Sequence, residues 1–233
     1  MRKKVTPAPV RRNAIVTRDR VLKAAIAEFC RYGFDGARTG RVAKRASVNI
    51  RMIYHYFGSK ERLYLAALEH VYREVRTREA ALNLRDHAPA EGMRALVDFT
   101  FKHLIEHPEF IELIRNENLL RGKHLKKSRS VPETAMPLVS ALRDLLTRGV
   151  RQGVFRRNVD PVQLYVSILS LCFIHLSNRY TLSIMFSMDL SDEQWLAERL
   201  KHVQAIVSSF LASDASRFPA KSINGGTKRA VKE

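Results

Sequence analysis

The stretch TGRVAKRASVNIRMIYHYFGSK, residues 39–60, holds two short helical patterns separated by a break of about three residues. The first pattern starts at Thr39, whose hydroxyl we expect to cap it, and the second follows Asn49, another favourable cap, to about Phe57. Two short helices joined by a turn of this length have the dimensions of a helix-turn-helix. Because such pairs also occur in proteins that never touch DNA, the interpretation depends on the rest of the chain.

Longer helical patterns flank this pair on both sides. Residues 17–33 repeat apolar positions at the i, i+3, i+4, i+7 spacing of one helix face, and the glycine at their end fits a helix stop. Residues 59–75 repeat the same spacing, with Ser59 as the cap. Ile53 and Phe57, four residues apart, would pack the second short helix against these neighbours.

The remainder of the chain is also helical in pattern, and neither strand alternation nor an internal repeat stands out. We expect further helices over 89–107, 108–121, 132–152, 161–178 and 191–211. Asp160 and Pro161 open the fourth of these, and Ser191 with Gln194 forms a capping box for the fifth. The predicted fold class is therefore all-α, with an N-terminal three-helix helix-turn-helix domain and a larger C-terminal helical domain.

Composition and helix stops divide the chain into four parts. Residues 1–13 hold two prolines and five basic side chains, which predicts a disordered basic arm. We place the helix-turn-helix domain at residues 14–75, the C-terminal domain at residues 76–213 and a flexible tail at residues 214–233.

Positive charge is concentrated near the N-terminus. The chain carries a formal net charge of +18; residues 1–62 hold 16 Lys and Arg against 4 Asp and Glu, whereas residues 63–216 hold 20 against 18. A concentrated positive region attracts a polyanion, and nucleic acid is the commonest one. An anionic membrane surface and simple solubility are the alternatives.

Several other protein classes find little support in the sequence. No uninterrupted run of about 18 apolar residues is present, so we expect no membrane span. The two cysteines, Cys30 and Cys172, lie far apart and give neither a disulfide framework nor metal-ligand spacing. HLIEH at residues 103–107 matches a zinc-peptidase arrangement, but Pro108 ends the helix directly after it and no further ligand pattern stands out. We therefore expect a cytoplasmic protein without cofactor, metal or enzymatic activity.

The residues around the opening stretch resemble the DNA-binding domain of TetR/AcrR-type regulators. EFCRYGFDGAR precedes the stretch at residues 28–38, and its Gly-Phe pair at 33–34 fits that family, as does the Y-x-x-F-x-x-K spacing at 54–60. The resemblance covers about residues 15–75. One departure lies in the turn, where Ser47 stands in place of the usual glycine.

The resemblance and the residue types together predict which side chains meet DNA. Arg51 replaces a usually small residue near the N-terminus of the recognition helix, where a guanidinium can reach guanine O6 and N7 together. Tyr54 and His55 can donate to phosphates, as can Lys60 at the start of the next helix. Asn49 could instead serve only as a cap. The predicted DNA-contacting residues are Thr39, Asn49, Ile50, Arg51, Met52, Tyr54, His55 and Lys60.

The pattern PVQLYVSILSLCFIHLSN at residues 161–178 is apolar nearly all round, which predicts a helix buried on two sides. One side would face the chain's own core and the other a second subunit, as in the dimers of the family that the chain resembles. Such a homodimer would present two recognition helices to palindromic double-stranded DNA. The alternative is that both sides serve the intramolecular core. The predicted interface residues are Ser167, Ser170, Ile174, Ser177, Leu200, Val203, Val207 and Phe210.

The resemblance also implies a pocket for a small-molecule effector in the C-terminal domain. The candidate ligand-binding residues are Phe99, His103, Glu117, Asn118, Cys172, His175 and Asn178, and for each of them a satisfied buried polar group is the alternative. The predicted function is a sequence-specific DNA-binding transcriptional regulator, a repressor that its effector releases from the operator. An activator, or a redox-sensing regulator that uses Cys30 or Cys172, remains the alternative.

Overall fold

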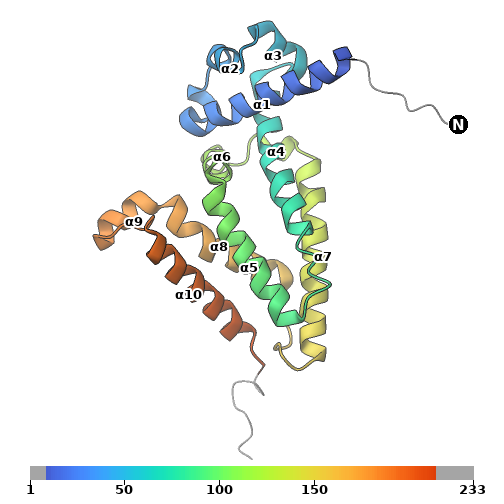
Figure 1. Ribbon diagram of the computed structural model, residues 1–233, viewed down its shortest axis with the longest axis vertical. Helices are drawn as coiled ribbons and strands as arrows, with labels where there is room; N and C mark the ends of the chain where they lie inside the picture. Colours follow the sequence, from blue (N-terminus) through green and yellow to red (C-terminus); the bar gives the residue numbers. More distant parts are fainter. Residues whose placement is uncertain (1–8, 214–233) are drawn as a thin grey trace, which may run out of the picture.

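The computed structural model describes residues 9–213, which form ten α-helices and one 3₁₀-helix (Figure 1). No β-strand occurs within this range, and the predicted all-α class is confirmed. The helices are α1 Pro9–Gly36, α2 Thr39–Ala46, α3 Ile50–Phe57, α4 Lys60–Ala80, α5 Pro89–Glu106, α6 Pro108–Leu119, η1 Leu125–Lys127, α7 Ser130–Arg151, α8 Pro161–Ser177, α9 Arg179–Phe186 and α10 Glu193–Leu211. The predictions for residues 1–8 and 214–233 lie outside the described residues.

The first helix is longer than its sequence pattern predicts. It begins at Pro9 rather than near residue 17, so the part of the predicted disordered arm at residues 9–13 is helical. Proline suits a helix start because its missing N–H would have no partner there, and no glycine or second proline follows before Gly33. At Gly33 the backbone takes φ +65°, which interrupts the helix where the sequence predicts a stop.

The turn between α2 and α3 is built from two polar residues. Ser47 adopts the left-handed conformation, φ +51°, that a glycine usually takes at a helix end. The Asn49 side chain accepts a hydrogen bond from Arg51 N at 2.9 Å, which confirms Asn49 as the N-cap of α3. The predicted cap at Thr39 is wrong, because Arg38 holds the N-cap position and Thr39 is the first helical residue of α2.

Three helices share one small core in this first domain. Ile53 and Phe57 of α3 are buried, and they belong to the same apolar cluster as Phe29 of α1 and Val42 of α2. Because α3 is short, these two inward side chains fix which of its faces is left for solvent.

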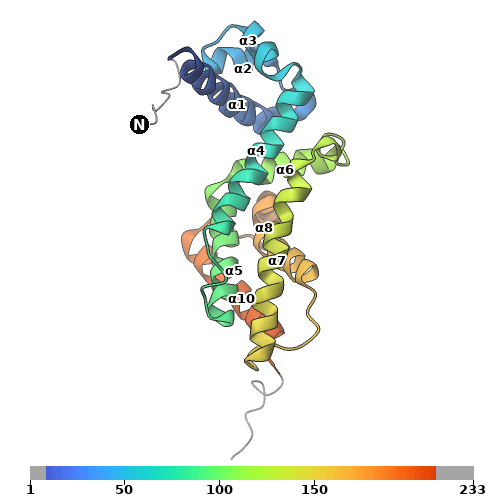
Figure 2. The same ribbon diagram turned by 90° about the vertical axis from the view of Figure 1, so that its right-hand side faces the viewer.

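Helix α4 links the two domains. It leaves the helix-turn-helix, runs down the C-terminal domain and packs against α7; Figure 2 shows the resulting elongated molecule. Ser59 caps α4 by accepting from Arg62 N at 3.2 Å, as the sequence predicts. Helix α6 lies directly below the first domain and packs on both α1 and α4. The C-terminal domain therefore touches the helix-turn-helix through α4 and α6.

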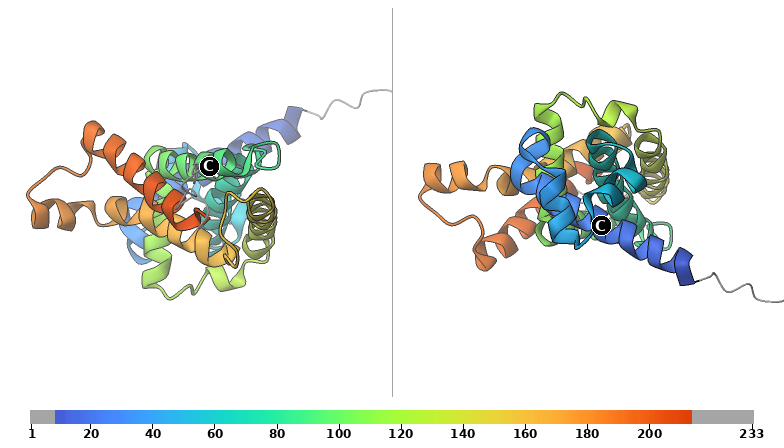
Figure 3. Two further views of the ribbon diagram at one scale, coloured as in Figure 1. Left: turned by 90° about the horizontal axis from the view of Figure 1, so that it is seen from below. Right: turned by 90° about the horizontal axis from the view of Figure 1, so that it is seen from above.

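Helix α5 lies at the centre of the C-terminal domain and packs against α7, α8 and α10. Helix α9, which has no counterpart among the predicted helices, joins α8 to α10 and projects sideways from the bundle (Figure 3). The predicted capping box of Ser191 and Gln194 is wrong. Asp192 is the N-cap of α10 and accepts from Trp195 N at 2.9 Å.

Within residues 9–213, no single helix has both the length and the apolar composition needed to cross a membrane. Helices α8 and α9 meet that criterion only as a pair, with a bend of 73° between them.

Candidate nucleic-acid interface

Helix α3 presents a mixed aromatic and cationic face to solvent. Arg51 and His55 are exposed, and the apolar surfaces of Ile50 and Tyr54 remain 41% and 47% exposed. Met52 is half-buried beside them. The exposed side chains of this face are therefore available to a partner.

Two residues of the predicted DNA-contacting set meet each other across the helix pair. The hydroxyl of Thr39 at the start of α2 lies 3.3 Å from the phenol oxygen of Tyr54 on α3. This contact holds the Tyr54 ring beside the N-terminus of α2. Asn49 uses its side-chain oxygen for the helix cap, so only its amide NH₂ group remains to donate to a partner.

Lys60 is half-buried and already has partners within the first domain. Its ammonium donates to the Asp35 carbonyl oxygen at 3.3 Å and lies 4.8 Å from the centre of the Phe34 ring. An ammonium has three N–H donors, so these contacts leave capacity for a phosphate oxygen. The structure thus gives Lys60 a role in packing beside the predicted DNA contact.

A buried carboxylate that sequence reasoning missed fixes α2 against α1. Glu28, with 1% of its surface exposed, accepts from Arg41 Nε at 2.6 Å and from the backbone N–H of Arg38 at 3.0 Å. Charge-assisted bonds of this kind are among the stronger polar contacts in proteins. The available signal was the position of Glu28 between the apolar Ala25 and Phe29 on the inward face of α1.

Two further cations, also absent from the predicted set, border this surface. Lys44 and Arg45 lie exposed in the last turn of α2, the first helix of the pair, which crosses the sugar-phosphate backbone in helix-turn-helix docking. The available signal was their position near the end of the first short helical pattern, close to the break that follows it.

The structure buries some of the predicted ligand-binding residues and leaves others exposed. His103 is buried and stacks on Phe99, with ring centres 5.4 Å apart. His175 stacks on Phe101 of α5 at 5.2 Å, and Cys172 is fully buried one turn earlier on α8. Asn118 and Asn178 are exposed.

Glu117 has a structural role instead. Its buried carboxylate accepts from the backbone N–H groups of His124 and Leu125 at 2.7 and 2.8 Å, and it lies 3.1 Å from His124 Nδ1. These bonds hold the loop after α6 in place. We therefore remove Glu117 from the candidate ligand-binding set.

The structure has a cavity of about 540 Å³ elsewhere, between α4, α7 and the segment that joins α4 to α5. None of the seven predicted ligand-binding residues lines it. Its polar lining comes from α4, from the segment after α4 and from Thr134 of α7. In sequence, the contributing part of α4 looks like an ordinary solvated helix face.

The predicted dimer residues differ in exposure and divide into three groups. Ser167, Ser170 and Ile174 of α8 are exposed, as is Phe210 of α10, whereas Ser177 and Leu200 are half-buried. Val203 and Val207 are buried in the chain's own core, with 0% and 4% of their surfaces exposed, and cannot face a second subunit. Val203 and Val207 repeat at helical spacing because they lie on the face of α10 that packs against α5 and α8.

The H-x-x-E-H motif is not arranged as a metal site. Within residues 9–213 no group of three or more His, Cys, Asp or Glu side chains is placed to hold a metal ion. Burial lowers the pKa of His103 to about 4, while Glu106 is exposed. Burial also raises the pKa of the Cys30 and Cys172 thiols to about 12, which disfavours the thiolate that redox chemistry needs.

Sequence comparisons place both domains in one family. Residues 21–67 match the model of bacterial regulatory proteins of the tetR family, and residues 89–207 match the tetracyclin repressor-like C-terminal domain. The transcriptional repressor NicS of Pseudomonas putida is 39% identical over 187 residues, which are 80% of this chain and 88% of NicS. The transcriptional repressor SCO4008 of Streptomyces coelicolor is 31% identical over 142 residues, 60% of this chain and 69% of that protein.

Solved structures share the fold at lower sequence identity. A TetR family transcription regulator from Marinobacter aquaeolei superposes with a TM-score of 0.65, at 18% identity, over 87% of this chain and 99% of its own. The ketosteroid transcriptional regulator KstR2 of Mycobacterium tuberculosis gives 0.64, at 18% identity, over 84% and 95%. With both domain models matched in order and a relative at 39% identity, the chain belongs to the TetR family of DNA-binding transcriptional regulators.

Proposed function

We propose that this regulator is a repressor, that it binds a palindromic operator as a homodimer, and that a small-molecule effector releases it. The observation that carries the proposal is the open face of α3, where Arg51, Tyr54 and His55 stand exposed on a helix fixed from behind by Ile53 and Phe57. Such a helix can enter the major groove without any rearrangement of its own core.

The names of two relatives support repression over activation. Both NicS and SCO4008 are described as transcriptional repressors, and NicS aligns over most of its own length. A repressor needs only to occupy its operator, so the exposed DNA-binding face and a stable dimer are sufficient for this function.

The exposed apolar side chains of α8, α9 and α10 support a homodimer. On and directly after α9, the exposed fractions are 67% for Tyr180, 79% for Ile184, 67% for Met185, 60% for Phe186 and 44% for Met188. On α8 and α10, Val162, Val166, Ile174, Ile206 and Phe210 are also exposed. A stable interface buries about 800 Å² on each partner, and large exposed apolar patches commonly mark protein–protein contacts.

The course of α4 supports effector control. This helix starts at Lys60, directly behind α3, and its other end lines the cavity between α4 and α7. A ligand that prefers one position of α4 relative to α7 would therefore also change how α3 is presented. Helix α6, packed on α1 and α4, would transmit the same displacement.

Transcription and operator binding test the proposal together. Deleting the gene should raise the transcripts next to the operator, and a metabolite that binds the C-terminal domain should lower operator affinity in an electrophoretic mobility shift. A fall in those transcripts on deletion would identify an activator instead. Unchanged transcripts, with unchanged operator affinity across a broad metabolite panel, would reject ligand-controlled repression.

A further inference from the structure

We propose that the cavity between α4 and α7 binds an organic anion, a carboxylate or sulfonate on an apolar body, with Arg76 as its main anchor. The inference rests on the proposed function, because it names the chemical class of the effector. The cavity has a volume of about 540 Å³, which falls within the range of about 300–1,000 Å³ that small-molecule sites have.

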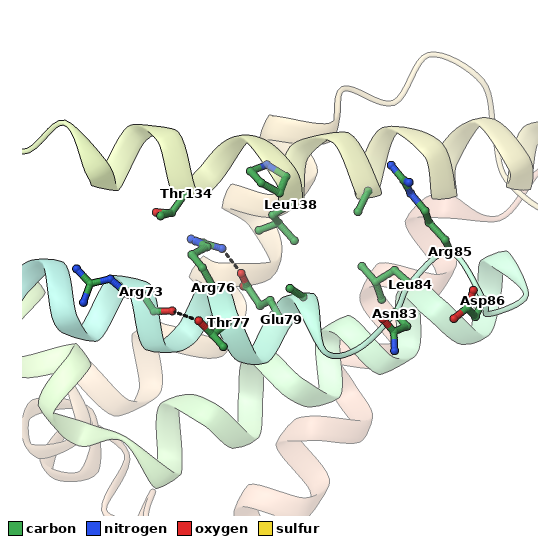
Figure 4. A pocket seen from close by; sticks show the side chains of 13 residues that line it. Arg73, Arg76, Thr77, Glu79, Asn83, Leu84, Arg85, Asp86, Thr134 and Leu138 are labelled. Carbon is green, nitrogen blue, oxygen red and sulfur yellow. Dashed lines mark hydrogen bonds and ion pairs between the residues drawn. The ribbon is translucent and has the colours of Figure 1, made fainter. Parts of the chain in front are cut away.

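The walls of the cavity are largely apolar. Leu138 and Ala141 of α7 face Ala80 of α4, and Leu84 closes the side formed by the segment after α4. Figure 4 shows α7 carrying Thr134 and Leu138 on one side and α4 carrying Arg76 and Glu79 on the other. Such walls favour a ligand whose body is apolar and whose polar group is confined to one end.

Arg76 is held in place by two neighbours that use only part of its hydrogen-bonding capacity. Its Nη1 atom donates to Glu79 and, at 3.1 Å, to the phenol oxygen of Tyr165 on α8. The Tyr165 hydroxyl in turn donates to Glu79 Oε1 at 3.0 Å. A guanidinium has five N–H donors. Among the described residues, the Nε and Nη2 atoms of Arg76 have no hydrogen-bond partner.

This arrangement fixes a cation whose open edge has the geometry of an anion site. The Arg76 side chain is only 14% exposed, and Glu79 and Tyr165 restrict its rotation. A guanidinium edge formed by Nε and Nη2 can bind both oxygens of a carboxylate in parallel. Because the supporting bonds exist before the ligand arrives, little side-chain entropy is lost when it binds.

The charges of the lining favour an anion over a cation. Arg73 and Arg85 stand at opposite ends of the cavity (Figure 4), so three arginines line it against Glu79 and Asp86. Glu79 is buried, with 4% of its surface exposed, and its charge is already paired with Arg76, so it is poorly placed to meet a cationic ligand. Arg73, Arg85 and Asp86 are all exposed, so water screens their charges. The half-buried Arg76 is therefore the main source of the preference for an anion.

A pair of fluorescent probes that differ only in charge tests this site. 1-Anilinonaphthalene-8-sulfonate carries an anionic group on an apolar body, and N-phenyl-1-naphthylamine is the same body without it. We expect the full-length protein to bind the sulfonate at least about tenfold more tightly, because a charge-assisted hydrogen-bond pair favours it. Equal affinity for the two probes would overturn the proposal.

Substitutions in the cavity test whether the sulfonate probe binds there. Arg76→Lys keeps a positive charge beside Glu79 but removes the guanidinium edge, and should weaken the sulfonate about tenfold while leaving the neutral probe unchanged. Ala141→Trp should fill the cavity and abolish binding of both. Arg78→Gln is the matched control, since Arg78 lies exposed on α4, pairs with Glu74 and does not line the cavity.

The outcomes separate the site from the proposed function. Circular dichroism melting establishes that each variant is folded, and if Arg76→Lys fails to fold, Arg73→Gln and Ala141→Trp decide the question. Sulfonate binding that survives Ala141→Trp in a folded protein would place the probe elsewhere and overturn the inference. These titrations contain no DNA, so a failure of the wild-type protein to bind any operator would contradict the proposed function and not the site.

Discussion

Arg51 stands exposed in the first turn of α3, where its backbone N–H is already used by Asn49 and its guanidinium has no partner among the described residues. Side chains at this end of a recognition helix meet base edges. We predict that Arg51→Ala relaxes the preference at one base pair per half-site, at a cost of about 1–3 kcal/mol of discrimination. Competition binding on operators changed at single positions measures it. Equal loss on every operator variant would show that Arg51 contacts phosphate or solvent.

Lys60 should behave differently, because it lies outside α3. We predict that Lys60→Ala weakens binding to all sequences alike and flattens the log–log salt dependence by about one unit for each lost phosphate contact. The ammonium also bonds to Asp35 and packs on Phe34, so the variant's melting temperature has to be compared with that of the wild type. Arg94→Ala, on the exposed surface of α5, is a control and should leave the salt dependence unchanged. An unchanged salt slope for Lys60→Ala in a fully folded protein would remove Lys60 from the DNA-contacting set.

Loss of the Glu28 carboxylate should destabilise the first domain. Glu28→Ala leaves the Arg38 N–H and the Arg41 guanidinium without their buried acceptor. We expect a loss of about 1.5–3 kcal/mol in the free energy of unfolding, as for other charge-assisted bonds. Urea denaturation measures it. The matched control is Asp19→Ala, which removes an exposed i, i+4 pair with Lys23 on the same helix and should not change the midpoint.

At the scale of secondary-structure elements, the correct predictions concern features set by residues close together in sequence, such as helix caps and helix stops. The caps Asn49, Ser59 and Asp160 lie next to the backbone N–H groups that they bond, so residue type and position suffice to identify them. The stop at Gly33 is equally local, because only glycine adopts its φ of +65° at no steric cost. Where two neighbouring residues could both cap a helix, sequence alone does not decide between them. At the start of α10 the N-cap is Asp192 and not Ser191.

What the sequence could not predict depends on distant partners. The bonds from Arg41 to Glu28 and from Arg76 to Tyr165 join different helices, so neither could be inferred before the packing was known. Helix α9 has exposed apolar side chains and no buried residue, and its short pattern merges with that of α8. The candidate ligand residues do not line the cavity between α4 and α7, and sequence could not exclude them from it, since a buried histidine such as His103 looks the same in sequence whether it lines a pocket or a core.

Two buried histidines of the C-terminal domain also predict a pH dependence of stability. Burial lowers the pKa of His103 on α5 and His175 on α8 from the ordinary value of 6.5 to about 4. Both rings are neutral in the folded protein at pH 7, whereas the unfolded chain binds protons below pH 6.5. The stability that this neutral state contributes is therefore fully present above pH 6.5, falls as the pH drops, and is lost by about pH 4.

Urea midpoints between about pH 7.5 and about pH 5 measure this dependence. His175→Phe should make the midpoint less sensitive to pH, because one of the two depressed groups is gone and a ring of similar shape still faces Phe101. His202→Gln, on the exposed face of α10, is the control. An identical pH dependence in His175→Phe and wild type would refute the explanation.

At the scale of the whole molecule, two copies have to join so that two α3 helices can face one palindrome. Ser170 lies on the exposed face of α8, between Val166 and Ile174. We predict that Ser170→Arg yields monomers, because an unpaired buried charge costs several kcal/mol in an interface. Analytical ultracentrifugation measures the mass, with Ser140→Arg on the exposed face of α7 as the control. A Ser170→Arg protein that remained dimeric would place the interface elsewhere.

The most direct test of sequence-specific binding by a dimer is selection of bound fragments from random duplex DNA, at a stated salt concentration of about 150 mM. The wild-type protein should enrich one inverted repeat, whose half-sites are separated by about one helical turn of DNA or a multiple of it. Ser170→Arg should lose that enrichment, and Arg51→Ala should retain the repeat with one position relaxed in each half. If the wild-type protein enriched no sequence, or only a single unrepeated half-site, the account of a dimer that reads a palindrome through α3 would be wrong.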